Sequence, residues 1–199
     1  MKRTEILIGG VGGQGVILAG ILLGTAATLY DGKKAIQTQA YSSEQRGGMA
    51  KAEVILSDEA ITDPQVRRPD ILIALAEDAI RRHLAKVRPR GLVVVDSDLI
   101  RKIPLGDFEV LSLPATTLAE REGNTMVANL ILLGGLIGKK GLLSVSAMEK
   151  AIETNVPAKA QELNLRAFRL GLRYVAEEGS PQAEQGNLKD RHFPKGEFR

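Results

Sequence analysis

The 199-residue sequence contains no cysteine, and this absence excludes several kinds of chemistry. Without thiols the chain can form no disulfide, no catalytic thiolate and no iron–sulfur cluster held by its own side chains. Its only imidazoles belong to His83 and His192, and neither lies beside carboxylates at ligand spacing. We therefore expect no metal site in this chain. With no cysteine and no credible signal peptide, a cytoplasmic location is expected.

Aromatic residues and excess charge are also scarce. Aromatics make up 4% of the sequence and the net charge is only +3, which argues against a nucleic-acid-binding surface. One dense basic run, RRHLAKVRPR, covers Arg81–Arg90. Ile80, Leu84 and Val87 recur there at helical spacing, so the run is interpreted first as the solvated face of a helix. An anionic ligand or an acidic protein surface is the alternative.

The longest uncharged stretch is ILIGGVGGQGVILAGILLGTAATLY, which follows Glu5 and has the length of a membrane span. Five of its seven glycines fall between Gly9 and Gly15. Each interior glycine costs a helix about 1 kcal/mol relative to alanine, so this cluster would break a span or a signal-peptide core. We predict instead a strand at Glu5–Ile8, a glycine turn at Gly9–Gly15 and a helix at Val16–Tyr30, with no membrane association.

The rest of the chain predicts strands that alternate with helices. Lys33–Tyr41 and Met49–Ser57 have period-two patterns, which favour a hairpin or edge pair with one wetter face. The apolar runs Asp70–Ala76 and Gly91–Ser97 are typical of central parallel strands, with the helix Glu77–Val87 between them. Further elements are expected as a strand at Phe108–Ala115 and helices at Thr117–Glu122, Thr125–Gly138, Val145–Glu153 and Ala158–Glu178.

This order of elements predicts an α/β fold, a Rossmann-like three-layer domain with a mostly parallel sheet and a helical C-terminal third. Residues 1–178 are expected to form this single domain, and the polar residues 179–199 to be extended or disordered. The helix at Thr125–Gly138 has no charged side, which predicts either a buried helix or a subunit contact.

Gly10, Gly12 and Gly15 fit the G-x-G-x-x-G motif in the expected position between a strand and a helix. A dinucleotide site would also need an acidic residue about 20 positions later, to bind the ribose hydroxyls. Gln37, Thr38 and Gln39 stand there instead, and Asp31 comes too early. NAD is therefore disfavoured. The glycines serve either helix–sheet packing alone or a different anion.

Four stretches, taken in order, resemble the γ subunit of 2-oxoacid:ferredoxin oxidoreductases. They are GVGGQGVILAG (Gly10–Gly20), SSEQRGG (Ser42–Gly48) running into AKAEVILSD, PDILIAL (Pro69–Leu75) and EGNTMVANLILLGGL (Glu122–Leu136). The resemblance covers Thr4 to Leu172, and its specificity comes from the coupling of GGQG to E-x-R-G-G.

One departure concerns the loop, because Ser42 and Ser43 stand where a Gly-Pro pair tends to precede the glutamate in the family. The QTQ-Y stretch before the loop is most similar to the 2-oxoglutarate type, with the pyruvate, branched-chain and indolepyruvate types as alternatives.

The resemblance implies an enzyme subunit that is inactive alone. Such complexes convert a 2-oxoacid, coenzyme A (CoA) and oxidised ferredoxin to acyl-CoA, carbon dioxide and reduced ferredoxin. The resemblance implies that thiamine diphosphate and magnesium lie on a β subunit, and the iron–sulfur clusters on β or on a ferredoxin-like δ subunit. It also implies a hetero-oligomer that contains an α subunit. A free-standing nucleotide-binding module remains the rival hypothesis.

The resemblance also implies where this chain would bind part of CoA. The glycine turn would present backbone amides to the diphosphate, and the loop would add hydroxyls and a guanidinium; the residues are Gly12, Gly13, Gln14, Gly15, Ser42, Ser43 and Arg46. No catalytic residue is assigned, since Glu44 is interpreted as an interface or loop-ordering residue. Asp96 and Asn124 are interpreted mainly as helix caps.

Overall fold

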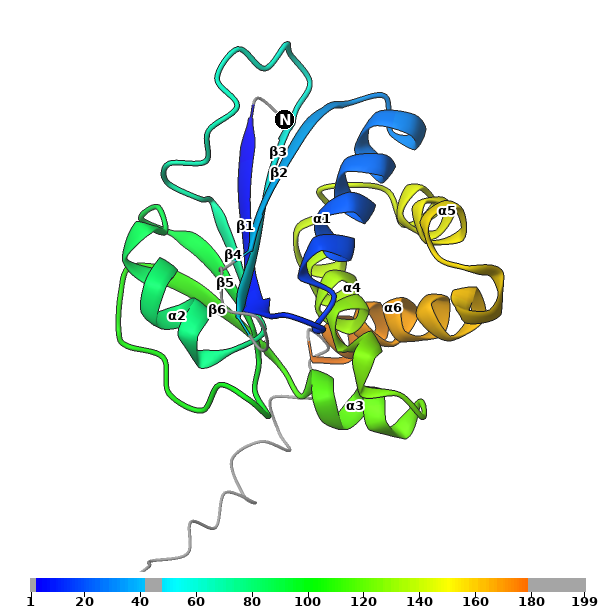
Figure 1. The fold of residues 1–199 in the computed structure, drawn as a ribbon. Helices are drawn as coiled ribbons and strands as arrows, with labels where there is room; N and C mark the ends of the chain where they lie inside the picture. Colours follow the sequence, from blue (N-terminus) through cyan, green and yellow to red (C-terminus); the bar gives the residue numbers. More distant parts are fainter. Residues whose placement is uncertain (1–2, 42–47, 179–199) are drawn as a thin grey trace, which may run out of the picture.

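The computed structural model describes residues 3–41 and 48–178. In these residues six strands form one sheet in the order β2-β3-β1-β4-β5-β6, with helices on both faces (Figure 1). The strands are β1 (Thr4–Val11), β2 (Lys34–Tyr41), β3 (Met49–Ser57), β4 (Ile71–Ala74), β5 (Gly91–Asp96) and β6 (Phe108–Leu113). The predicted tail, residues 179–199, lies outside the described residues.

The helices follow the predicted order. They are α1 (Val16–Thr25), α2 (Glu77–His83), α3 (Ala115–Arg121), α4 (Ala128–Lys140), α5 (Val145–Asn155) and α6 (Ala158–Glu178). A π-helical turn η1 (Ala26–Tyr30) extends α1, and two 3-10 turns, η2 (Leu84–Lys86) and η3 (Thr125–Val127), follow α2 and precede α4. Among the residues described, no helix combines the length and the apolar character needed to cross a membrane.

The sheet is mostly parallel, as predicted. β1, β4, β5 and β6 run parallel, and β3 pairs antiparallel with both β1 and β2. The predicted edge pair is therefore confirmed, with Lys34 opposite Ser57 and Tyr41 opposite Ala50. The alternation in β3 has a direct cause: Ala50, Ala52, Val54 and Leu56 are buried toward the main core.

The two faces of the sheet carry unequal layers. α1, α3, α4, α5 and α6 cover one face, and α2 with η2 covers part of the other (Figure 1). The uncharged helix is confirmed as buried within the domain, because every residue of α4 from Ala128 to Ile137 is buried. It packs tightly on α6: a Cβ at Gly134 would overlap the carbonyl oxygen of Phe168, and one at Gly171 would overlap that of Ile131.

The predicted glycine turn at Gly9–Gly15 is too long. β1 continues through Gly9 and Gly10 to Val11, and the turn comprises only the residues after it. Gly9 faces α2, where an added Cβ would lie 2.8 Å from the Cβ of Ala79. Gly10 faces the start of α1, where an added Cβ would lie 2.9 Å from Val16 Cγ2. These two glycines therefore permit close packing on opposite faces of the strand, not chain reversal.

Candidate functional site

The glycine turn lies at the point of the sheet where the connections from neighbouring strands lead to opposite faces. β1 leads into α1 on one face, whereas β4 leads into α2 on the opposite face (Figure 1). The carboxyl ends of β1 and β4 are neighbours, since these strands pair in parallel. Open α/β sheets bind ligands at such switch points, outside the carboxyl ends of the strands.

Two glycines of the turn adopt left-handed backbone angles, with φ of 94° at Gly13 and 71° at Gly15. Gly15 is the N-cap of α1. The Gly12 amide donates to the Gly48 carbonyl oxygen at 3.0 Å, and the Gln14 amide to that of Val11 at 3.1 Å. Within the described part of the chain, the amides of Gly13 and Gly15 have no acceptor. These two amides can therefore bind a ligand.

The side chain of Gln14 fixes the turn from one side. Its Oε1 accepts from the Val11 amide at 2.7 Å, and its Nε2 donates to the Leu75 carbonyl oxygen at 2.8 Å. It thereby joins the end of β1 to the residue that follows β4. We infer that Gln14 shapes the turn, since both its amide and its side chain are used within the chain.

Asn129, at the start of α4, fixes the turn from the other side. It is 2% exposed, and its Nδ2 donates to the Gly15 carbonyl oxygen at 3.1 Å while its Oδ1 accepts from the Leu130 amide at 3.0 Å. The sequence did not identify this role. The available signal was an amide side chain inside an otherwise apolar helix, because a buried polar group requires a partner.

A cavity of about 160 Å³ opens beside the turn. Leu99 and Met126 flank it and are 41% and 65% exposed, so their apolar side chains are accessible to a ligand. Thr116 and Thr125 supply hydroxyl groups. The complete lining is Gly13, Gln14, Leu75, Asp96, Leu99, Thr116, Thr125, Met126 and Ala128. Apolar and polar groups therefore share one small hollow at the carboxyl edge of the sheet.

Asp96 is fully buried next to this cavity and acts as a helix cap, as interpreted from the sequence. Its Oδ1 accepts from the amides of Asp98 and Ala115, and its Oδ2 accepts from the amide and hydroxyl of Thr116 at 3.1 and 2.7 Å. Four donors occupy the acceptor capacity of a carboxylate. Asn124 is likewise a cap, because its Oδ1 accepts from the Met126 amide at 2.9 Å.

The loop residues Ser42, Ser43, Glu44 and Arg46 lie outside the described residues. The two ends of their segment are described, however. β2 ends at Tyr41, and Gly48 binds the Gly12 amide immediately before β3 begins. Both strand ends lie at the same edge of the sheet as the glycine turn, because Val11 is opposite Met49 and Tyr41 is opposite Ala50.

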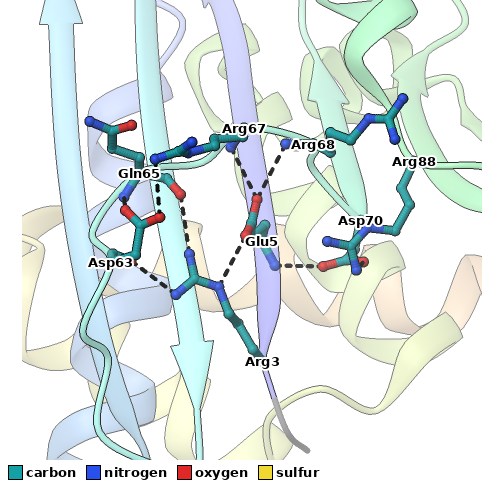
Figure 2. Close-up of polar contacts among 8 residues, drawn as sticks. All are labelled: Arg3, Glu5, Asp63, Gln65, Arg67, Arg68, Asp70 and Arg88. Carbon is teal, nitrogen blue, oxygen red and sulfur yellow. Dashed lines mark hydrogen bonds and ion pairs between the residues drawn. The ribbon is translucent and has the colours of Figure 1, made fainter.

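The opposite edge of the sheet carries the densest set of polar contacts, centred on the buried Glu5 (Figure 2). Its Oε1 binds Arg3 Nε at 3.0 Å, and its Oε2 accepts from the amides of Arg67 and Arg68. Arg3 also donates to the carbonyl oxygens of Asp63 and Gln65. These contacts hold the long β3–β4 connection against the start of β1, so we interpret them as structural.

Among the described residues, no three or more His, Asp or Glu side chains are grouped so that they could hold a metal ion. The geometry also bears on the dinucleotide hypothesis. β3 separates β1 from β2, so the strand after the first helix is not the neighbour of the first strand. The strand that carries the ribose-binding acid in a dinucleotide fold therefore does not lie beside β1 here.

Comparison with known proteins decides the family. A family model described as pyruvate ferredoxin/flavodoxin oxidoreductase matches residues 5–174. The chain belongs to this family. The 2-oxoglutarate synthase subunit KorC of Methanothermobacter thermautotrophicus is 44% identical to it, over 88% of this chain and 96% of that protein. The ketoisovalerate oxidoreductase subunit VorA of the same organism is 31% identical, over 88% of this chain and 37% of that protein.

Solved structures of the family have the same fold. The γ subunit of keto/oxoacid ferredoxin oxidoreductase from Geobacter sulfurreducens superposes with a TM-score of 0.78 at 38% identity, over 87% of this chain and 99% of that one. The 2-oxoglutarate:ferredoxin oxidoreductase from Magnetococcus marinus, solved with 2-oxoglutarate, coenzyme A and succinyl-CoA bound, gives 0.80 at 20% identity, over 89% and 32%. The predicted resemblance to γ subunits and the predicted α/β fold are both confirmed.

Proposed function

We propose that this chain is the γ subunit of a CoA-acylating 2-oxoglutarate:ferredoxin oxidoreductase. The complex would convert 2-oxoglutarate, CoA and oxidised ferredoxin to succinyl-CoA, carbon dioxide and reduced ferredoxin. The observation that carries the proposal is the near-complete match to KorC, at 44% identity against 31% for the ketoisovalerate subunit. Measured kcat/KM values of the assembled enzyme for 2-oxoglutarate, pyruvate and ketoisovalerate test the choice of substrate.

The proposal assigns the redox chemistry to other chains. α, β and in some complexes δ subunits would accompany this one in the cytoplasm, with thiamine diphosphate, magnesium and the iron–sulfur clusters on them. Since this sequence has no cysteine, it supplies no thiolate to a cluster. The chain purified alone should therefore show no 2-oxoglutarate-dependent dye reduction.

The share of this chain in CoA binding would be an anion site at the start of α1. The free amides of Gly13 and Gly15 lie at a helix N-terminus, where unpaired donors and the helix dipole favour phosphate. Supporting this proposal, a Cβ built at Gly13 would meet no atom of the described residues within 4 Å, so the backbone there is open to a ligand. Gly12 and Gln14 would keep the turn in shape through the contacts described above.

Ser42, Ser43 and Arg46 would complete this site from the segment between Tyr41 and Gly48. What supports this assignment is that Gly48, the first described residue after Arg46, accepts a hydrogen bond from the Gly12 amide of the turn. Arg46 would add a charge-assisted bond to a phosphate, a contribution of about 1.5–3 kcal/mol. The exposed side chains of Leu99 and Met126 would contact the apolar part of CoA.

Steady-state kinetics of the reconstituted complex test the site. Arg46→Ala should raise the KM for CoA by roughly ten-fold to a hundred-fold and leave the KM for 2-oxoglutarate almost unchanged. Gly13→Val should act in the same direction, because it fills the space at the turn. Arg173→Ala, an exposed arginine on α6, is the matched control. If Arg46→Ala and Gly13→Val assemble normally and keep the wild-type KM for CoA, the turn has only a structural role.

A further inference from the structure

A second and larger hollow lies on the opposite face of the sheet from α1, between α2 with η2 and the segment of residues 101–107. Its volume is about 670 Å³. Ile80, Leu84, Val87 and Phe108 line it and pack against the smaller of the two hydrophobic cores. We call this hollow the α2 groove. α2 and η2 contain most of the basic run that the proposed function leaves unexplained.

The apolar surface continues beyond the α2 groove. Leu105, on its rim, is fully exposed, and Val110 on the edge strand β6 is 42% exposed. Leu111 and Leu113 of β6 are buried in the main core, so alternation places Phe108 and Val110 on the groove side of the sheet. A small molecule in the groove would not cover Val110, which is not among the lining residues. Apolar surface that continues from a groove onto an exposed edge strand is typical of a protein-binding surface.

The charges around the α2 groove indicate the sign of the partner. Arg81 and Lys102 line it together with Glu77 and Asp107, so the lining itself is balanced. Lys86 and Arg101 are adjacent in sequence to lining residues. Among the described residues, no ion pair involves Lys86, Arg101 or Lys102, nor Glu77 or Asp107, so cations outnumber anions among these unpaired groups. The excess cations favour carboxylates on the partner. A second copy docked by two-fold symmetry would instead place these cations against themselves.

We propose that the α2 groove, together with Leu105 and Val110, is a docking surface for another subunit of the oxidoreductase complex. The docking segment inserts an apolar side chain into the groove and places carboxylates against Lys102 and its neighbouring cations. The inference rests on the proposed function, which supplies the other subunits, but it concerns a face of the sheet that the CoA site does not use.

A titration of this chain, fluorescently labelled, against the purified remainder of the complex tests the inference. Leu105→Glu should raise the dissociation constant at least about ten-fold, as expected for an anchoring side chain at an interface. Lys102→Glu should raise it by roughly three-fold to ten-fold and flatten its dependence on salt, because a screened attraction is replaced by repulsion. Leu29→Glu is the matched control, since Leu29 is 66% exposed on η1, beyond α1.

Melting temperatures measured for each variant separate docking from folding. Wild-type affinity of both Leu105→Glu and Lys102→Glu would overturn the docking surface and leave the proposed function standing. Equal weakening by Leu29→Glu would also overturn it. A dimer of the isolated chain that Leu105→Glu dissociates would overturn it in favour of self-association. If the wild-type chain does not bind the other subunits at all, the proposed function itself fails.

Discussion

Replacing Gly15 with alanine should destabilise the chain far more than the same change at Gly13. Both glycines have left-handed φ angles, at which an L-residue costs about 1–2 kcal/mol. Their surroundings differ completely. A Cβ at Gly13 meets no atom of residues 3–41 and 48–178 within 4 Å, whereas one at Gly15 overlaps Asn129 Nδ2 and lies 2.9 Å from Asn129 Cγ. The two substitutions thus share the cost of the left-handed backbone and differ in the cost of the overlap with Asn129.

The cost of this overlap can be assigned a magnitude. The added methyl would displace the Asn129 amide, which is 2% exposed and donates to the Gly15 carbonyl oxygen. An unpaired buried donor costs about 1–3 kcal/mol. Gly13→Ala should therefore lower the free energy of unfolding by about 1–2 kcal/mol, and Gly15→Ala by about 2–5 kcal/mol.

Urea unfolding at 25 °C, followed by far-UV circular dichroism, measures both values. Asn129→Ala combined with Gly15→Ala provides the internal check, because removing the amide also removes the overlap. The double variant should be more stable than the sum of the two single changes predicts. Equal losses for Gly13→Ala and Gly15→Ala, or strict additivity of the pair with Asn129→Ala, would refute this account of the turn.

Three further substitutions test the helix packing and the pH response. Gly171→Ala should lower the free energy of unfolding by at least about 2 kcal/mol, because the added Cβ overlaps the Ile131 carbonyl oxygen. Gly24→Ala, on α1 with no described atom near its Cβ, should raise it by up to about 1 kcal/mol. Thermal melts compare the two variants. Burial, and to a smaller extent nearby lysines, lowers the pKa of His83. The imidazole therefore binds a proton more readily in the unfolded chain than in the folded one. The free energy of unfolding should consequently fall as the pH drops below about 6.5. His83→Gln should reduce that fall, seen as urea midpoints at pH 7.5 and 5.5. The charged groups that act on His83 are Lys86, Lys51, Glu53 and Arg82.

Most of the fold could be predicted because its signals are local. The period-two pattern at Met49–Ser57 matches β3 residue for residue, since one face of that strand packs on α1. The glycine turn was harder to delimit. A glycine that reverses the chain and one that allows close packing both lack a side chain, so the sequence cannot separate Gly9 and Gly10 from Gly12 and Gly13. Only the neighbours Ala79 and Val16 distinguish them.

The position of the glycine turn could be predicted from the sequence, but the contacts that each of its residues makes could not. The sequence located the turn, in which Gly13 and Gly15 have the left-handed backbone angles that favour glycine. Gln14 was predicted to present its amide to a phosphate. In the structure that amide donates to the Val11 carbonyl oxygen, and the side chain joins the end of β1 to Leu75 after β4. Asn129 holds Gly15 across 114 positions of sequence. No local pattern encodes contacts at such separation.

The topology also explains how a motif shared with dinucleotide-binding folds can serve a different anion. In a dinucleotide fold, the strand after the first helix lies beside the first strand and carries the ribose-binding acid. Here β3 runs antiparallel between β1 and β2, so the chain returns from β2 at the carboxyl edge of β1. The Gly12–Gly48 hydrogen bond fixes that return against the turn. A single intervening strand thus moves the strand after the first helix, which would carry the ribose-binding carboxylate, away from β1. Under the proposed function, Arg46 would supply a phosphate contact in place of a ribose contact, because a guanidinium binds phosphate and a carboxylate repels it.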